Sequence, residues 1–203
     1  KTGRKFLYQL LESIKNSLEG EEYKIYIIDN GSIDNIKRDF EGDDKIFYHY
    51  IKDQSIGGIT YAWNLGVKRS IKDNCDIVLN LNDDLIINKT INIFISSIYN
   101  HPHKNISLFG PMTSIGGGPN HQIFSKNKHE IIETTGLDYG DESIKKLLGG
   151  YPLNGFALGF TKECYYNYNE DGWFFSRDVR DAWSNQETEF YVRNKPKGLK
   201  NYI

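Results

Sequence analysis

The chain has 203 residues, a formal net charge of −2 and 38% hydrophobic residues. The near-balance of charge argues against the broad basic surface that nucleic-acid binding needs, and the hydrophobic content excludes a disordered chain. No stretch approaches the roughly 20 apolar residues of a membrane-spanning helix. Two cysteines do not make a disulfide framework, although a single bridge stays open, and they suit a reducing compartment. The length indicates one domain over residues 1–203.

Hydrophobic patterning in the first half alternates between helical and strand-like segments. Apolar residues three and four positions apart predict amphipathic helices, whereas short apolar runs are typical of strands that are buried on both faces of a parallel sheet. The expected helices cover residues 3–18, 34–41 (weak), 59–72 and 89–100, and the expected strands cover residues 25–28, 46–51, 76–81 and 107–110.

The second half is less regular. We expect a loop at the glycine-rich residues 116–119, a short helix near 142–148, a strand over 156–160 with Thr161 capping the next helix, and a helix over 185–194. The aromatic residues within 165–183, such as Trp173, Phe174 and Trp183, either stack on a sugar or form core. The β-α-β-α order predicts an α/β fold with an open, mostly parallel sheet flanked by helices.

Two polar clusters follow expected strands, where open α/β sheets bind their ligands. In Asn82-Asp83-Asp84 the adjacent carboxylates repel each other unless a cation lies beside them, and Mg²⁺ or Mn²⁺ prefers such oxygen ligands. The alternative is solvated loop acids or a helix cap. In Asp29-Asn30-Gly31-Ser32, Asp29 either accepts hydrogen bonds from a nucleotide or belongs to an ordinary Asn-Gly turn.

A third candidate is Glu187, which begins the expected helix 185–194. It is a general base if the fold carries it to the edge of the sheet where the polar clusters lie. An ion-paired surface glutamate has the same appearance in the sequence.

Five segments, in order along the chain, resemble family 2 glycosyltransferases with the GT-A fold. The match extends over nearly the whole chain and divides it into a nucleotide-sugar-binding half, 1–110, and a mixed acceptor-binding half, 111–203. The segments are Asp29–Asp34; Ser55–Gly58 with Asn64–Gly66; Asn82–Asp84; Gly155–Leu158 with Thr161–Glu163; and Asn185–Phe190 with Arg193 and Lys197–Gly198.

The resemblance implies a nucleotide-sugar donor, expected to be a UDP-sugar. Asp29 would contact the nucleotide base and Asp83 the ribose, and Gly58 and Asn64 belong to the donor-binding segment. The implied acceptor is a hydroxyl of a glycan, a protein or a lipid-linked compound.

The resemblance also implies the chemistry. Asp84, with Asn82, would hold Mn²⁺ or Mg²⁺ at the donor diphosphate, and Glu187 would be the catalytic base of an inverting single displacement. Asn82 replaces a carboxylate of the family's metal motif, and Gln186-Glu187 replaces its Glu-Asp pair. The family's first strand precedes the point where this chain opens, so we expect the chain to be a fragment that lacks it.

Two other functions compete with this hypothesis. A noncatalytic nucleotide- or sugar-binding domain would account for the substitutions, and a nucleotidyltransferase would share the α/β plan, although no glycine- and basic-rich triphosphate loop lies near the start. Asn30-Gly31-Ser32 matches the N-glycosylation pattern. A glycan there would block the expected nucleotide pocket, which favours a cytoplasmic location, in a bacterium or in the host cell of a virus.

Overall fold

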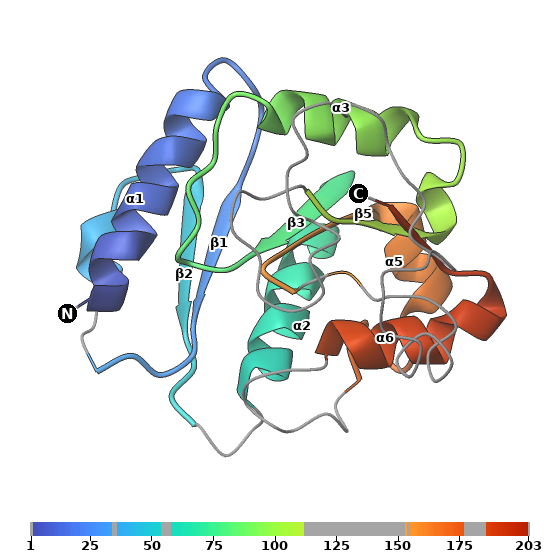
Figure 1. Cartoon of the computed structure of the whole chain (residues 1–203). Coiled ribbons are helices and arrows are strands. Elements are labelled where there is room, and N and C mark those ends of the chain that lie inside the picture. Colours follow the sequence, from blue (N-terminus) through green and yellow to red (C-terminus); the bar gives the residue numbers. More distant parts are fainter. Residues whose placement is uncertain are drawn as a thin grey trace.

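A computed structural model describes residues 2–33, 36–53, 58–111, 153, 155–176 and 186–202. Helices and strands alternate along its first half, as expected (Figure 1). The α-helices are α1 (Thr2–Ser17), α2 (Gly58–Lys72), α3 (Ile91–Asn100), α5 (Lys162–Tyr168) and α6 (Gln186–Asn194), and the 3-10 helices are η1 (Lys37–Phe40), η3 (Lys104–Ile106) and η5 (Lys195–Lys197). The strands are β1 (Ile25–Asp29), β2 (Ile46–Tyr50), β3 (Ile77–Leu81), β4 (Ser107–Phe109), β5 (Ala157–Thr161) and β6 (Lys200–Tyr202).

The described strands form two sheets. β1 and β2 form a parallel pair in which Ile25 lies opposite Ile46 and Asp29 opposite Tyr50. The second sheet has the order β3-β5-β4-β6, in which β5 is antiparallel to both of its neighbours and β4 is parallel to β6. The α/β architecture is confirmed, but the second sheet is mixed because β5, from the second half of the chain, lies between β3 and β4.

Burial explains why β5 takes this central place. Its five residues are all buried, so their backbone groups need partners within the protein rather than water. Val78 of β3 pairs with Phe160, and Phe109 of β4 pairs with Gly159. Thr161 ends the strand, and its hydroxyl accepts a hydrogen bond from the backbone N–H of Cys164 at 3.2 Å. This confirms the predicted helix cap.

The largest core cluster lies between β3, β5 and the helices α2, α5 and α6. Phe174 and Phe175 are completely buried in it. The ring centroid of Phe174 lies 4.5 Å from that of Phe160 and 4.4 Å from that of Phe190. The core interpretation of these two aromatic residues is therefore confirmed, whereas Trp183 lies outside the described residues.

Helix α1 packs against strands of both sheets and against α3. Leu10 and Ile14 pack with Ile91 of α3 and with Leu79 of β3, and Leu11 packs with Ile46 of β2. These contacts use the apolar face that the spacing predicts. None of the helices in the described part of the chain has the length and hydropathy that a membrane crossing requires.

Most other expected elements agree with the structure. The weak helix expected over 34–41 is the shorter 3-10 helix η1, and residues 34 and 35 lie outside the described residues. The expected loop at 116–119 and the expected helix at 142–148 also lie outside them. The final strand β6 was not expected, because its sequence, Lys200-Asn201-Tyr202, has no apolar run. The single domain and the missing first strand stay predictions.

Candidate active site

The acidic turn Asn82-Asp83-Asp84 directly follows β3. The backbone N–H of Asn82 donates a hydrogen bond of 2.8 Å to the carbonyl of Phe156, so the turn is tied to the residue that precedes β5. Asp83 and Asp84 are both exposed. Desolvation by the surrounding protein raises the pKa of Asp83, and the neighbouring charge of Asp84 raises it further. A pair of carboxylates that repel each other attracts a cation.

Glu187 packs against Gly155, the residue before Phe156. A Cβ atom built on Gly155 would lie 2.9 Å from Oε2 of Glu187 and 2.9 Å from Cη2 of Trp63. The Glu187 carboxylate and the Trp63 ring therefore both pack against the bare Cα of Gly155, which only glycine permits. Because Phe156 follows Gly155 and receives the Asn82 hydrogen bond, a segment of two residues joins the predicted base to the acidic turn.

Glu187 lies in the first turn of α6, where helix N–H groups favour negative charge. Its side chain is half-buried, and this burial raises the pKa of its carboxyl above the usual range. Hydrogen bonds from its own backbone N–H and from that of Gly155 oppose the increase. A carboxylate that is oriented by N–H donors and has a raised pKa is suited to accept a proton.

Asp29 ends β1 and is buried. One carboxylate oxygen accepts a hydrogen bond from the backbone N–H of Ser32 at 2.7 Å, and the other accepts one from the hydroxyl of Tyr48. Gly31 has a φ of 86°, a left-handed conformation that suits glycine. The turn indicated by the Asn-Gly pair is present, whereas the contact of Asp29 with a nucleotide base stays a prediction.

Gly58 and Asn64 belong to helix α2. Gly58 is its first residue and has a φ of 58°. The Asn64 side chain is buried, and its amide makes four hydrogen bonds within the protein, to the backbone of Thr60, Phe174 and Phe175. This uses both N–H groups and both lone pairs of the amide. Donor binding by either residue stays a prediction.

No group of three or more His, Cys, Asp or Glu side chains able to hold a metal ion occurs in the described ranges. Of the predicted metal ligands, Asp84 supplies one carboxylate and Asn82 adds an amide oxygen. Mg²⁺-like ions are commonly held by one or two carboxylates together with substrate phosphates. The donor set therefore fits a metal ion whose coordination is completed by a diphosphate.

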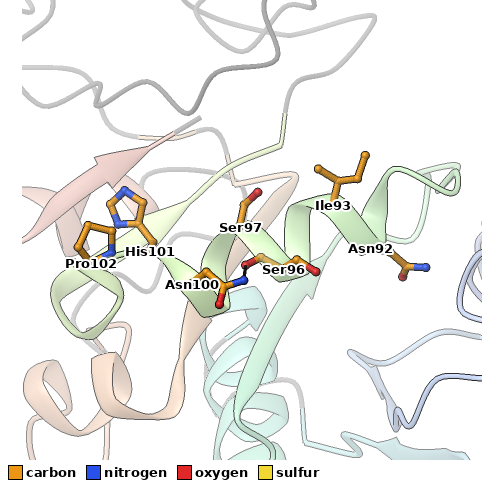
Figure 2. A pocket seen from close by; sticks show the side chains of 7 residues that line it. All are labelled: Asn92, Ile93, Ser96, Ser97, Asn100, His101 and Pro102. Atoms are coloured by element: carbon orange, nitrogen blue, oxygen red, sulfur yellow. Dashed lines mark hydrogen bonds between the residues drawn. The ribbon is translucent and has the colours of Figure 1, made fainter.

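A groove of about 600 Å³ runs along α3, and its described lining includes none of the residues of the acidic turn (Figure 2). Its described lining includes the amides of Asn92 and Asn100 and the ring of His101, but no carboxylate. The His101 ring packs against Tyr202 at 4.1 Å between centroids. The acid–base group in this lining is His101, and no carboxylate accompanies it. Glu187 and the acidic turn, which carry the carboxylates predicted from the sequence, remain the candidate active site.

The sequence predicted Glu187 and the acidic turn as site residues but did not single out two neighbours of Glu187, Trp63 and Gly155. Trp63 lies within the regular pattern of an amphipathic helix, so nothing in the sequence distinguishes it from a core residue. Gly155 belongs to a segment that resembles the family's acceptor side, but its packing against Glu187 depends on the fold.

Comparisons with known proteins identify a family and a similar fold. The profile of the family described as "Glycosyl transferase family 2" matches residues 2–147. Among solved structures, that of TarS residues 1–349 from S. aureus is similar, with a TM-score of 0.61 and 15% sequence identity. The alignment covers 94% of this chain and 51% of that structure, so the chain spans about half of its length. No curated protein matches the chain.

Proposed function

Because the chain belongs to glycosyl transferase family 2, we propose that it transfers a sugar from a nucleotide sugar, specifically a UDP-sugar, to a hydroxyl acceptor. One observation carries the proposal: the half-buried Glu187 carboxylate packs on Gly155, one residue from the Phe156 carbonyl to which the acidic turn is tied. The predicted base and the predicted cation-binding oxygens therefore both adjoin the segment Gly155-Phe156, which supports their acting together on one donor.

The proposed reaction is a single displacement. Glu187 takes the proton of the acceptor hydroxyl while that oxygen attacks the anomeric carbon of the donor sugar. The bond between the anomeric carbon and the diphosphate oxygen breaks, its electron pair leaves with the nucleoside diphosphate, and the anomeric configuration inverts. The raised pKa of Glu187 supports the role of base, because a more basic carboxylate accepts the proton of the acceptor hydroxyl more readily.

The donor would lie along the acidic turn. In this proposal Asp84 and Asn82 hold Mn²⁺ or Mg²⁺, which supplies positive charge to the diphosphate when it is bound. Asp83 faces the ribose, and Asp29, at the end of β1, faces the base. Asn82 offers oxygen without charge, so Asp84 contributes most of the electrostatic attraction. The proposed acceptor is a hydroxyl of a glycan, a protein or a lipid-linked compound. The proposed location of the protein is the cytoplasm.

The proposal is tested by comparing Glu187→Gln with Glu163→Gln. Glu163 is the matched control because it also lies in the first turn of a helix, α5, but is exposed. Release of UDP from a set of UDP-sugars is measured with Mn²⁺ and simple glycan acceptors, and binding of UDP is measured by calorimetry. We expect Glu187→Gln to lower transfer by about 10²- to 10⁴-fold, the usual contribution of a general base, with UDP binding unchanged.

Other outcomes assign a different function. Normal turnover combined with weaker UDP binding in Glu187→Gln would contradict its role as base. UDP binding by the unaltered protein without sugar transfer would favour the noncatalytic domain. Release of pyrophosphate from a nucleoside triphosphate and a sugar phosphate would favour the nucleotidyltransferase.

A further inference from the structure

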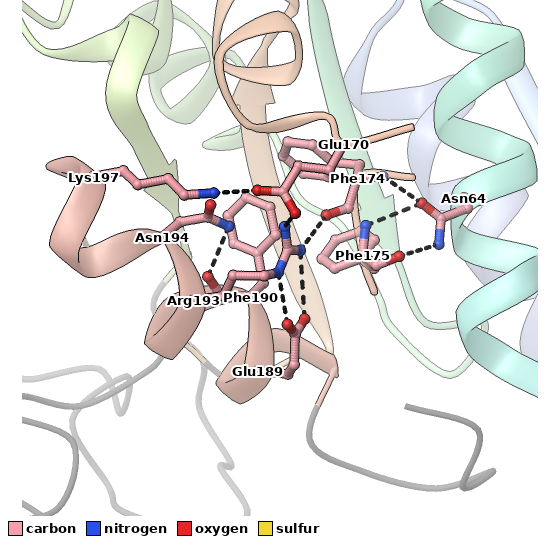
Figure 3. A network of polar contacts seen from close by, with 9 residues as sticks. All are labelled: Asn64, Glu170, Phe174, Phe175, Glu189, Phe190, Arg193, Asn194 and Lys197. Atoms are coloured by element: carbon pink, nitrogen blue, oxygen red, sulfur yellow. Dashed lines mark hydrogen bonds and ion pairs between the residues drawn. The ribbon is translucent and has the colours of Figure 1, made fainter. Parts of the chain in front are cut away.

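A short segment, residues 173–175, lies between helices α2 and α6 (Figure 3). Phe174 and Phe175 fill the core with their side chains, and their backbone groups make polar contacts on two sides. Asn64 of α2 provides the contacts on one side, and Arg193 of α6 provides those on the other. The backbone of this segment therefore connects the two helices.

On the side of α2, the side-chain amide of Asn64 hydrogen-bonds to backbone N–H and C=O groups of the segment. Its oxygen accepts hydrogen bonds from the backbone N–H groups of Phe174 and Phe175, at 2.8 and 3.0 Å. Its nitrogen donates to the carbonyl of Phe175 at 2.8 Å and to that of Thr60 at 2.9 Å. Asn64 is 2% exposed, so removal of the amide takes hydrogen-bond partners from backbone groups in the protein interior.

On the side of α6, Arg193 holds the same segment. Its Nη2 donates to the carbonyl of Phe174 at 3.0 Å, and its Nε donates to Oε1 of Glu189 at 2.7 Å. Its Nη1 also forms an ion pair of 3.1 Å with Glu170, just before the segment. The planar guanidinium thus fixes α6 against the segment in one orientation.

The two helices that the segment connects also hold the two neighbours of Gly155. Trp63 precedes Asn64 on α2, and Glu187 lies on α6, six residues before Arg193. An α-helix rises 1.5 Å per residue, so Arg193 and Glu187 are separated by about 9 Å along a rigid axis. Any shift of α6 relative to α2 therefore moves Glu187 relative to Trp63, which packs against Gly155.

We propose that Asn64 and Arg193 are positioning residues, which hold Glu187 against Gly155 through the backbone of residues 173–175. The proposal rests on the proposed role of Glu187 as base. It also gives Asn64 a role other than the donor contact that the sequence indicated. If the amide is lost, the segment and α6 are no longer fixed to α2, the Glu187 carboxylate gains water, and its pKa falls towards the ordinary value, because burial is the main cause of the increase.

The test is the pKa of Glu187, measured without substrate by carbon-detected NMR of its labelled carboxyl group, in Asn64→Ala and Arg193→Lys. Ser70→Ala is the control, since Ser70 is also a buried polar residue of α2, but its hydroxyl donates to the carbonyl of Gly66, away from the segment. We expect both test variants to lower this pKa and the control to leave it unchanged. In transfer assays kcat should fall, its acidic limb should move to lower pH, and the KM for the donor should stay unchanged.

Several results would overturn the proposal. One is an unchanged Glu187 pKa in folded Arg193→Lys. This variant keeps the charge and the helix, so it tests the proposal even if Asn64→Ala does not fold. Another is a raised donor KM in Asn64→Ala with the Glu187 pKa unchanged, which would make Asn64 a donor contact. Because the NMR titration needs no turnover, it decides the positioning role even if the chain transfers no sugar, a result that would contradict only the proposed function.

Discussion

Gly155→Ala is the substitution that tests the candidate active site most directly. The new Cβ would lie 2.9 Å from both Oε2 of Glu187 and Cη2 of Trp63. Gly155 does not have a positive φ, so the backbone accepts alanine and the effect is steric. Both neighbours are half-buried and approach the same position, so neither can move without disturbing its own packing.

The size of the effect follows from these distances. Non-bonded heavy atoms pack best at about 3.5–4.0 Å, so each neighbour must move by about 0.6 Å or more. Overpacking of this kind costs about 1–3 kcal/mol of stability. Displacing a catalytic group by about 1 Å costs on the order of 100-fold in rate, so we expect kcat to fall by about 10- to 100-fold.

The assay compares transfer and urea denaturation in Gly155→Ala and Gly42→Ala. Gly42 is the matched control because it has a φ of 93° and nothing within 4 Å of an added Cβ. Alanine there costs about 1–2 kcal/mol through backbone strain alone and should leave kcat unchanged. A Gly155→Ala protein with normal kcat and an unchanged Glu187 pKa would refute the reasoning that places the base against Gly155.

Four further predictions follow from the same geometry. Because a base acts in its ionised form and the pKa of Glu187 is raised, kcat should increase with pH around a midpoint above that of an ordinary glutamate; a midpoint at the ordinary value in a pH–rate profile would contradict this. The same raised pKa means that the folded state binds the Glu187 proton more tightly than the unfolded state, so this contribution to stability is complete at low pH and is lost as pH rises through the folded pKa. Glu187→Gln should remove that decline in urea titrations between acidic and neutral pH, and an unchanged pH dependence of stability would argue against a buried carboxyl. Asp84→Asn should weaken Mn²⁺ binding in the presence of UDP, measured by electron paramagnetic resonance, whereas the same change at the exposed Asp44 should not. Tyr48→Phe should cost about 1–3 kcal/mol in thermal or urea denaturation, because it removes a hydrogen-bond donor from the buried carboxylate of Asp29; unaltered stability would show that water replaces the hydroxyl.

The sequence predicted the described α-helices and most of the strands because each depends on local pattern. The apolar run at 25–28 becomes β1, and residues 76–81 contain β3. The order of strands was not predictable in the same way, since pairing joins distant residues. Val78 pairs with Phe160, more than 80 positions later, and no local signal states that β5 lies between β3 and β4.

The candidate site shows the same division. Residue type and spacing indicated Asp83 and Asp84, because adjacent carboxylates after a strand form a recognisable pattern, whereas the role predicted for Glu187 came from the resemblance to family 2 glycosyltransferases. The role of Asn64 differs, since its amide binds the backbone of Phe174 and Phe175, 110 and 111 positions away. An asparagine that binds a ligand and one that binds a distant loop look alike in the sequence, so only the fold distinguishes them.

The separation of the strands into two sheets has a consequence for cooperativity. In the described part of the chain, β1 and β2 pair only with each other, and side-chain contacts such as Ile28 beside Gly66 join them to the rest. Two strands that are joined only by side-chain packing unfold together less cooperatively than strands that share a hydrogen-bond ladder. Proteins open locally in cooperative units, and the border between the two sheets is a place where one unit can end. We therefore expect the amide hydrogens of β1 and β2 to exchange as one group, earlier than those of β5, so that the strand bearing Asp29 can open while the strands around Glu187 stay folded.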